Sequence, residues 1–251
     1  MKRVIKVGGR VQGDPRLAAA IVGAWRAAAG ALCVVHGGGD EISSLQRSLG
    51  IEPRFVGGRR VTTDADLDLL RMVLSGSSNK RLVSRIIDAG AQAIGLSGED
   101  AGLIAATPIA ATELGRVGAP AAVATALIDV LVRECYLPVI SPLARGPDGM
   151  PLNVNGDDAA AAVAVMWGAT ELVLLADVPG VMDGAGVVQS LDPDSARALI
   201  ASGVAGGGMA AKLEAALRAA RSGVPSVRIG DLSALTDPGA GTVLTAATSF
   251  V

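Results

Sequence analysis

The sequence is poor in aromatic, histidine and cysteine side chains. Aromatic residues make up 2% of its 251 residues, and it contains two cysteines and one histidine. Half of the residues are hydrophobic, so the core must be aliphatic, with small residues that let helices approach a sheet closely. Two cysteines and one histidine are too few for a disulfide framework or a zinc site. Cys33 and Cys135 lie in apolar surroundings, which indicates reduced core thiols in a cytoplasmic protein.

A long apolar run and a strong net charge are also missing. No segment reaches the roughly 18 consecutive apolar residues that a membrane span needs. The basic start leads directly into a strand pattern, so we expect no secretory signal. The formal net charge is −2, with 22 basic and 24 acidic residues, which predicts no nucleic-acid and no membrane partner.

Short β-branched runs alternate with helical periodicity along almost the whole chain. This pattern predicts an α/β fold with a mainly parallel central sheet and helices on both faces, a three-layer αβα sandwich. The turn sequence GPDG at 146–149 predicts a hairpin. We expect a pair of helices over about 64–90, with a break near SGSSNK. A soft boundary near residue 170 divides the chain into lobes at 1–169 and 170–251.

The first predicted strand, in RVIKVGGR, contains a lysine among apolar residues. A strand that is buried on both faces is normally a continuous apolar run, and burying an unpaired charge is costly. Lys6 therefore points to solvent from an edge of the sheet, or into a site that needs a positive charge.

Several predicted strands end in glycines, among them Gly8–Gly9, Gly37–Gly39 and Gly180. In open parallel sheets, ligands bind beyond the carboxyl ends of the strands, where glycine backbone N–H groups can cradle an anion. The alternative is that these glycines only form tight turns. Neither a P-loop nor a G-x-G-x-x-G fingerprint is present, which disfavours a Walker-type NTPase and a dinucleotide-dependent dehydrogenase.

Two further segments carry polar residues that need an explanation. In GGGMAAK, Lys212 is expected in the first turn of a helix, where a cation is unfavourable unless it meets an anion or solvent. In PLNVNGDD, Asn153, Asn155 and Asp157 alternate on one side of an extended segment before a helix. Helix capping explains one of these three residues but not all of them. The single histidine, His36, is interpreted as a structural residue that holds the adjacent glycine loop.

Taken together, the motifs follow the order typical of N-acetyl-L-glutamate kinases, a branch of the amino acid kinase family. They are KVGG, VVHGGG, GGRRVT, GSSNK, AIGLSGED, NVNGDDAA, LLADVPGVM and GGMAAK. The resemblance extends from residue 3 to residue 244. It implies an amino acid kinase-like sandwich and the transfer of a phosphoryl group from ATP to the γ-carboxylate of N-acetyl-L-glutamate. The product would be N-acetyl-L-glutamyl 5-phosphate for arginine biosynthesis, with Mg²⁺ on the nucleotide phosphates.

The resemblance assigns roles to the reacting centre. Lys6 and Lys212 would neutralise the charge of the transferred phosphoryl group, and Asp157 would hold both lysines in position. The backbone N–H groups of Gly9 and Gly38 would contact the same phosphoryl group.

The binding residues follow from the same resemblance. Arg60 would bind the α-carboxylate of the acceptor, Asn153 its N-acetyl amide region, and Gly38 and Gly39 would line its pocket. Asn155 belongs to the same motif without a defined role. The nucleotide pocket would comprise Asp177, Val178, Pro179, Gly180, Val181, Met182, Gly206, Gly207, Gly208 and Met209.

This chemistry agrees with the residues present. A γ-carboxylate, whose pKa is ordinarily about 4.3, is already ionised at neutral pH and needs no general base. The protein then has to position the reactants and neutralise charge, which are the main contributions to phosphoryl transfer.

Departures from the family pattern leave alternatives open. Arg59 and Thr63 are additions in GGRRVTTD, so the acceptor rim is expected to differ, and Gly156 is a mild change. The alternatives are a kinase for carrier-protein-linked glutamate or aminoadipate, and a non-catalytic nucleotide sensor. Relatives that are hexameric and inhibited by arginine carry an extra N-terminal helix, and its absence predicts a homodimer without arginine feedback. An apolar helix near 67–74 would supply the interface.

Overall fold

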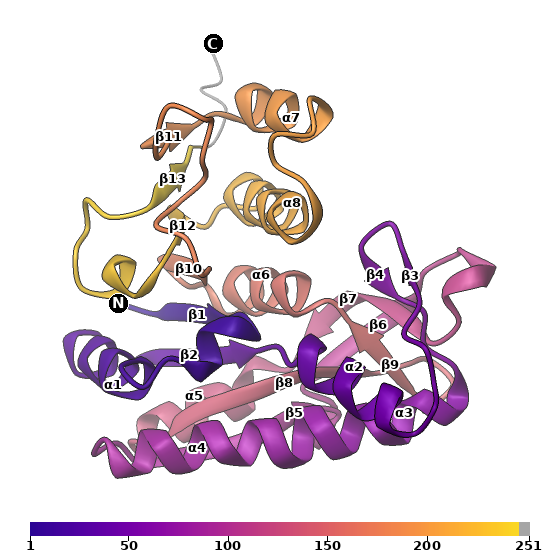
Figure 1. Cartoon of the computed structure of the whole chain (residues 1–251). Helices are drawn as coiled ribbons and strands as arrows, with labels where there is room; N and C mark the ends of the chain where they lie inside the picture. Colours follow the sequence, from indigo (N-terminus) through magenta and orange to yellow (C-terminus); the bar gives the residue numbers. More distant parts are fainter. Residues whose placement is uncertain (246–251) are drawn as a thin grey trace.

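The structure, a computed structural model, describes residues 1–245 and has a sheet of 11 strands at its centre (Figure 1). Six neighbouring strands in the middle of this sheet run parallel, which confirms the predicted mainly parallel arrangement. In spatial order they are β12 (Ser226–Gly230), β10 (Glu171–Leu175), β1 (Arg3–Val7), β2 (Leu32–His36), β8 (Leu137–Arg145) and β5 (Ala93–Gly98).

Antiparallel pairs extend the sheet at both margins. The hairpin predicted at 146–149 joins β8 to its antiparallel neighbour β9, and the N–H group of Gly146 donates to the carbonyl of Met150. A separate two-stranded hairpin lies outside the main sheet. The remaining strands are β3 (Phe55–Val56) and β4 (Arg59–Arg60) in that separate hairpin, and β6 (Ile104–Pro108), β7 (Val117–Val123), β9 (Pro151–Val154), β11 (Ser190–Leu191) and β13 (Thr242–Leu244) at the margins.

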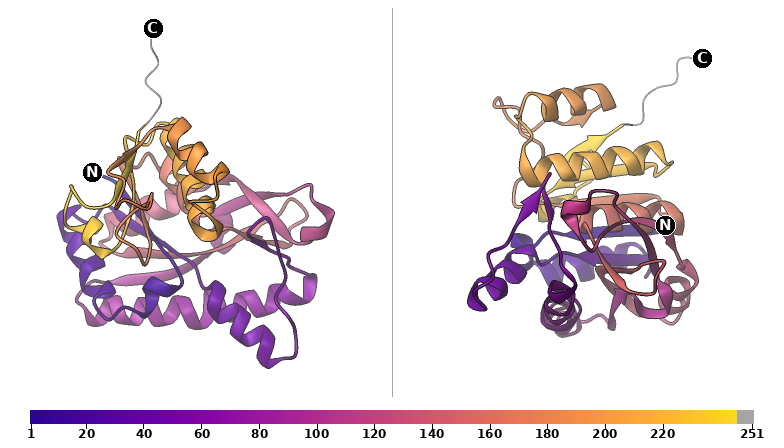
Figure 2. Two further views of the ribbon diagram at one scale, coloured as in Figure 1. Left: turned by 45° about the horizontal axis from the view of Figure 1, so that its top comes forward. Right: turned by 90° about the vertical axis from the view of Figure 1, so that its right-hand side faces the viewer.

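Helices pack on both faces of the sheet, so the three-layer αβα sandwich is confirmed (Figures 1 and 2). One aliphatic cluster joins the sheet to α1 (Leu17–Ala27) and α4 (Asn79–Asp88). A second cluster, on the opposite face, joins it to three further helices, of which the last two are rich in alanine. These are α5 (Thr125–Arg133), α6 (Gly156–Trp167) and α8 (Gly207–Arg221), and the remaining helices are α2 (Gly39–Ser48), α3 (Asp64–Leu70) and α7 (Pro193–Ala201).

The position of β1 decides between the two interpretations of Lys6. β1 lies between β10 and β2, in the middle of the sheet rather than at an edge. Side chains alternate along a strand, so Ile5 and Val7 pack in the cluster with α1, whereas Val4 packs in the cluster with α6. Lys6 shares the face of Val4 and is 6% exposed, so it points into the protein.

The chain between Asp64 and Asp88 is helical throughout, so the expected break near SGSSNK is wrong. Helix α3 runs into a π-helical segment, Arg71–Ser78, which runs directly into α4. Serine and glycine favour helices only weakly, but tertiary contacts override such preferences. Within the π-helical segment, the hydroxyl of Ser75 bonds that of Ser141 at 2.8 Å and ties the widened turn to β8.

One of the two cysteines departs from the prediction. Cys33 is buried in β2, whereas Cys135 is exposed, so its assignment to the core is wrong. Cys135 has a φ of 61° in the turn that follows α5. This left-handed conformation ends helices and is usually taken by glycine, and here it leaves the thiol exposed.

The division of the chain at residues 169 and 170 remains a prediction. The sheet crosses this point, because β1 pairs with β10 from Arg3 opposite Glu171 to Lys6 opposite Leu174. Within residues 1–245, none of the helices is both long and apolar enough to span a membrane.

Gly95 generates a first prediction, because a Cβ atom at this position in β5 would lie 1.9 Å from Oδ1 of the buried Asn79. Gly95→Ala should therefore lower the free energy of unfolding by about 2 kcal/mol, as overpacking does, and urea denaturation measures this. Gly23→Ala is the control, because no atom lies within 4 Å of its Cβ position in α1. The control should be neutral or slightly stabilising, and equal stability of the two variants would contradict the argument.

Candidate active site

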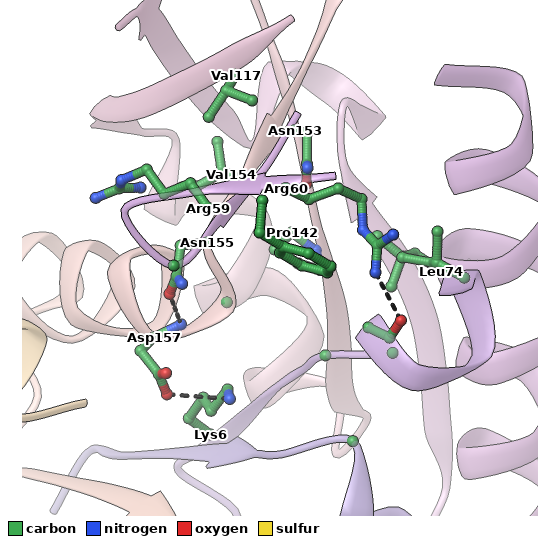
Figure 3. A pocket seen from close by; sticks show the side chains of 18 residues that line it. Lys6, Arg59, Arg60, Leu74, Val117, Pro142, Asn153, Val154, Asn155 and Asp157 are labelled. Carbon is green, nitrogen blue, oxygen red and sulfur yellow. Dashed lines mark hydrogen bonds and ion pairs between the residues drawn. The ribbon is translucent and has the colours of Figure 1, made fainter. Parts of the chain in front are cut away.

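Three charged side chains from distant parts of the chain meet beyond the carboxyl end of β1. The ammonium group of Lys6 lies 3.0 Å from Oδ1 of Asp157 (Figure 3). The ammonium group of Lys212 lies 3.1 Å from Oδ1 and 3.2 Å from Oδ2 of the same carboxylate. The cluster is nearly closed to solvent, since Asp157 is 5% and Lys6 6% exposed. Two ammonium groups share one carboxylate, so the cluster keeps one positive charge in excess.

The start of α6 places Asp157. Asn155 caps this helix, and its side-chain oxygen accepts from the N–H groups of Asp157 and Asp158. Gly156 allows Lys6 to approach, because a Cβ atom at this glycine would lie 3.3 Å from Cε of Lys6. The glycine is therefore part of the site's geometry.

Lys212 lies on α8, which begins at Gly207. It is the sixth residue of this helix and so belongs to the second turn, one turn later than expected. The carboxylate of Asp157 is the anion that the sequence pattern led us to expect beside Lys212.

The ionisation of the cluster follows from burial and mutual attraction. Burial opposes the ionisation of Asp157, but the charges of Lys6 and Lys212 outweigh it and lower the pKa of this carboxyl group. Burial, followed by repulsion from Lys6, lowers the pKa of Lys212 to about 8, although Asp157 opposes the shift. The ammonium group of Lys212 therefore loses its proton in the mildly alkaline range.

A network of neutral side chains fixes the glycine loop after β2. The amide nitrogen of Gln12 donates to the carbonyl of Gly37 at 2.6 Å, and its oxygen accepts from Ser78 at 2.9 Å. The amide nitrogen of Asn79 lies 3.0 Å from Nε2 of His36, so Nε2 accepts and Nδ1 donates to the carbonyl of Gly37 at 2.8 Å. Burial lowers the pKa of His36 to about 4, which keeps the ring neutral. The structural role predicted for His36 agrees with these contacts.

The glycine loop itself is closely packed. A Cβ atom at Gly38 would lie 2.8 Å from a methyl group of Leu74, so this position admits only glycine without rearrangement. Gly38 caps α2, whose N-terminus therefore faces the same region as the two lysines. Backbone N–H groups at a helix N-terminus attract anions.

Arg60 lies in the wall of a cavity of about 210 Å³ that also includes Lys6, Asn153 and Asn155. Its guanidinium group donates to the carbonyl of Gly39 at 2.7 Å. It also donates to the hydroxyl of Ser43 at 2.8 Å and to the side-chain oxygen of Gln46, and it lies over the ring of Phe55. Burial lowers the pKa of Arg60, while the charges of Asp66 and Asp40 oppose this shift.

The neighbours of Arg60 complete this wall. Asn153 donates to the hydroxyl of Thr62 at 2.9 Å, which orients its amide. Thr63 is the N-cap of α3 and forms a capping box with Asp66, so this apparent insertion has a structural role. Arg59 and Arg60 follow one another on β4 and point in opposite directions (Figure 3).

A larger cavity of about 570 Å³ adjoins the first and shares Lys6 and Asp157 with it. The predicted nucleotide residues Asp177, Val178, Gly207, Gly208 and Met209 line it together with Lys212. Other predicted residues lie away from this cavity.

Those other residues have packing or backbone roles. Gly206 caps α8. Gly180 packs against Val187 and Thr242, and the N–H group of the buried Val181 donates to the Thr242 hydroxyl at 2.8 Å. The structure gives no contact of Pro179 with the cavity, and Met182 is 43% exposed.

No group of three or more His, Cys, Asp and Glu side chains within residues 1–245 could hold a metal ion. Besides Asp157, the carboxylates of Asp40 and Asp177 line the larger cavity, and Asp177 is paired with Arg10 at 3.0 Å. Mg²⁺ is usually held by one or two carboxylates together with substrate phosphates and water. The donor set therefore fits a metal ion that arrives with a nucleotide.

Several supporting residues were not predicted, namely Gln12, Ser43, Gln46, Asp66 and Ser78. Ser43 and Gln46 are three positions apart on α2, next to its apolar face, and both are buried. Polar residues that interrupt an apolar helical face were the available signal, although their partners could not be identified from it.

Comparison with known proteins identifies the family of the chain. The amino acid kinase family matches residues 1–231. An acetylglutamate kinase of Chloroflexus aurantiacus is 44% identical over 239 residues, 94% of either chain, and one of Roseiflexus sp. (strain RS-1) is 44% identical over 94% of this chain and 91% of its own. The chain belongs to the amino acid kinase family.

Solved structures support the fold. A protein of Streptococcus mutans UA159 superimposes with a TM-score of 0.88 at 28% identity, over 97% of this chain and 98% of its own. A carbamate kinase of Giardia superimposes with a TM-score of 0.70 at 15% identity, over 97% of this chain and 98% of its own, which supports the fold alone. The amino acid kinase-like architecture is thus confirmed.

Removing the shared carboxylate tests the charge balance. Asp157→Asn leaves two ammonium groups buried without their anion, and breaking a buried ion pair in this way costs about 3 kcal/mol. We expect urea denaturation to show a loss of this size, which added phosphate partly reverses. Glu113→Gln, at an exposed position, is the control with the same chemical change. A variant as stable as the wild type would show that the cluster does not depend on Asp157.

Proposed function

We propose that the protein transfers the γ-phosphoryl group of ATP to the γ-carboxylate of N-acetyl-L-glutamate, a step of arginine biosynthesis. The observation that carries this proposal is the cluster of Lys6, Asp157 and Lys212, which lies where the two cavities meet. Relatives named acetylglutamate kinase, 44% identical over 94% of the chain, support the same reaction.

The smaller cavity would hold the acceptor. Arg60 would meet its α-carboxylate, because a guanidinium group offers parallel donors to a carboxylate. Asn153 would contact the N-acetyl amide region, and Asn155, which lines the same cavity, caps α6. Gly38 and Gly39 would complete the wall on the side of α2.

The transfer itself needs no general base, because the γ-carboxylate is ionised at neutral pH. One carboxylate oxygen bonds to the γ-phosphorus while the bond to the β,γ-bridging oxygen breaks, and ADP leaves with that electron pair. Lys6 and Lys212 would stabilise the charge on the transferred group, with Asp157 between them. The N–H groups of Gly9 and Gly38 would donate to its oxygens. Fixed donors of this kind act strongly where water is excluded.

The larger cavity would hold the nucleotide between the predicted segments 177–182 and 206–209. Asp40 or Asp177, which line the same cavity, would hold a Mg²⁺ ion that arrives with the nucleotide. The contribution of the ion when bound is to neutralise phosphate charge.

A homodimer without arginine feedback remains a prediction from the resemblance. Met72 is 62% exposed on the helical segment expected to form the interface.

A panel of acceptors tests the proposal. ADP release would be followed with Mg-ATP and N-acetyl-L-glutamate, free glutamate, N-acetyl-aminoadipate, carbamate or UMP, and the acyl phosphate would be trapped with hydroxylamine. We expect turnover with N-acetyl-L-glutamate, and at least a roughly hundredfold lower rate in Lys6→Ala. Turnover only with a carrier-linked amino acid would support the carrier-linked alternative, and ATP binding without any turnover would support a sensor.

The pH profile reports on Lys212. In the free protein its pKa is lowered to about 8, so the cluster keeps its excess positive charge below this pH and loses it above. We expect kcat/KM for ATP to be level below pH 8 and to fall roughly tenfold per pH unit above it. Bound phosphates favour the ammonium form, so kcat should fall only at higher pH.

Lys212→Arg is the matched variant for this profile. Arginine keeps its charge throughout this range, so the variant should lose the alkaline fall in kcat/KM even if its rate is lower. A wild-type profile that stays level to pH 9.5 would show that Lys212 does not limit binding.

A further inference from the structure

Asp158, the residue after Asp157, is a second buried carboxylate with a different set of partners. It is 9% exposed and lies in the first turn of α6. Its Oδ2 atom accepts from Nη2 of Arg59 at 2.8 Å, and its Oδ1 atom accepts from Nη2 of Arg218. Each oxygen of the carboxylate therefore binds a different arginine.

The two arginines belong to elements on different sides of the reacting cluster: Arg59 lines the smaller cavity, and Arg218 lies on the helix that carries Lys212. Arg59 lies on β4, and its hairpin lines the smaller cavity with Phe55 and Gly58. Arg218 lies on α8, six residues beyond Lys212, and this helix begins with Gly207 at the larger cavity. Asp158 thus connects the hairpin beside the acceptor with the helix that carries a lysine of the reacting cluster.

Arg59 retains a donor that the protein does not use. Its Nη1 atom is buried and has no hydrogen-bond partner within residues 1–245. A buried donor without a partner is unfavourable. Arg59 lines the smaller cavity, so an oxygen atom of a bound acceptor can supply the missing partner. Acceptor binding would then strengthen the placement of the hairpin, and with it the placement of Asp158.

A purely structural ion pair is the competing explanation. A carboxylate near a helix N-terminus is stabilised by the helix dipole, and a buried carboxylate needs cationic partners in any fold. This explanation accounts for the burial of Asp158. It gives no reason for one partner to lie in the wall of the acceptor cavity and the other on the helix that carries Lys212, and it predicts no effect of one ligand on the other.

We propose that Asp158 is a positioning residue that couples the two substrate sites through Arg59 and Arg218; this rests on the proposed function. Acceptor binding holds the hairpin, Asp158 transmits this position to α8, and α8 carries Lys212 toward the phosphoryl group. Coupling between sites is reciprocal, so nucleotide binding tightens acceptor binding by the same factor.

Calorimetry measures this factor. The Kd of N-acetyl-L-glutamate would be determined without and with saturating Mg²⁺ and a non-hydrolysable ATP analogue. We expect a ratio of roughly fivefold or more in the wild type, the lower end of typical coupling. The ratio should approach one in Asp158→Asn and in Arg218→Gln, and it should recover in Asp158→Glu.

Arg221→Gln is the matched control, because Arg221 lies on the same helix and the structure gives it no ion pair within residues 1–245. It should keep the wild-type ratio. Arg59→Gln combined with Arg218→Gln should lower the ratio no further than either change alone, since both act through one carboxylate. Thermal denaturation of each variant shows that it is folded.

The outcomes separate the two proposals. If the wild type binds N-acetyl-L-glutamate in neither condition, the proposed function fails, and this inference fails with it. If the wild type shows the ratio and folded Asp158→Asn retains it, the proposed function stands, Asp158 is only a structural ion pair, and the inference is overturned.

Discussion

A carboxylate in contact with two ammonium groups, and almost closed to water, is stable only while the three charges remain together. Asp157 is in this situation, since it lies within 3.2 Å of both Lys6 and Lys212. Each charge comes from a different element, so β1, α6 and α8 must meet at one point. Asn155 caps α6 and fixes the start of the helix that carries Asp157, and Gly156 has no side chain that would obstruct Lys6. The excess positive charge is then available for an anionic ligand.

The neutral network around the glycine loop complements these charges. His36, Gln12 and Asn79 hold the loop through amide and imidazole groups, and none of them carries charge near neutral pH. Placing a further cation there would add to the repulsion between the lysines, and an anion would compete with a phosphate. The loop is therefore positioned without changing the electrostatics of the cluster, which is the preorganisation that transition-state stabilisation requires.

Some parts of this arrangement could be predicted from local sequence, and others could not. Lys6 interrupts an apolar strand, so a short stretch of sequence singled it out, but only the place of β1 between β10 and β2 shows that it points into the protein. The motif order gave Asp157 and Lys212. The partners of Arg60 and of the glycine loop depend instead on how helices rotate and pack. The bond between Gln46 and Asp66 spans 20 positions and that between Gln12 and Ser78 spans 66, and no periodicity links such pairs.

The dependence on tertiary contacts also explains where the local structure differs from the sequence prediction. Serine and glycine at 75–77 suggested a break in the helix, but contacts with β8 keep the chain helical. Cys135 follows the apolar helix α5 and precedes the buried strand β8, yet the turn in which it lies leaves it exposed. In both cases a tertiary constraint outweighs the local preference.

The central place of β1 has a consequence for how the protein is made. β1 is synthesised well before its neighbour β10, which begins at Glu171. At about 5–20 residues per second, roughly 10 to 30 s pass before this second neighbour is synthesised. During that time the first strand has one edge without a partner and a lysine without its aspartate. Contacts between such distant segments slow folding, and the reacting centre cannot close before Lys212 on α8 has been synthesised.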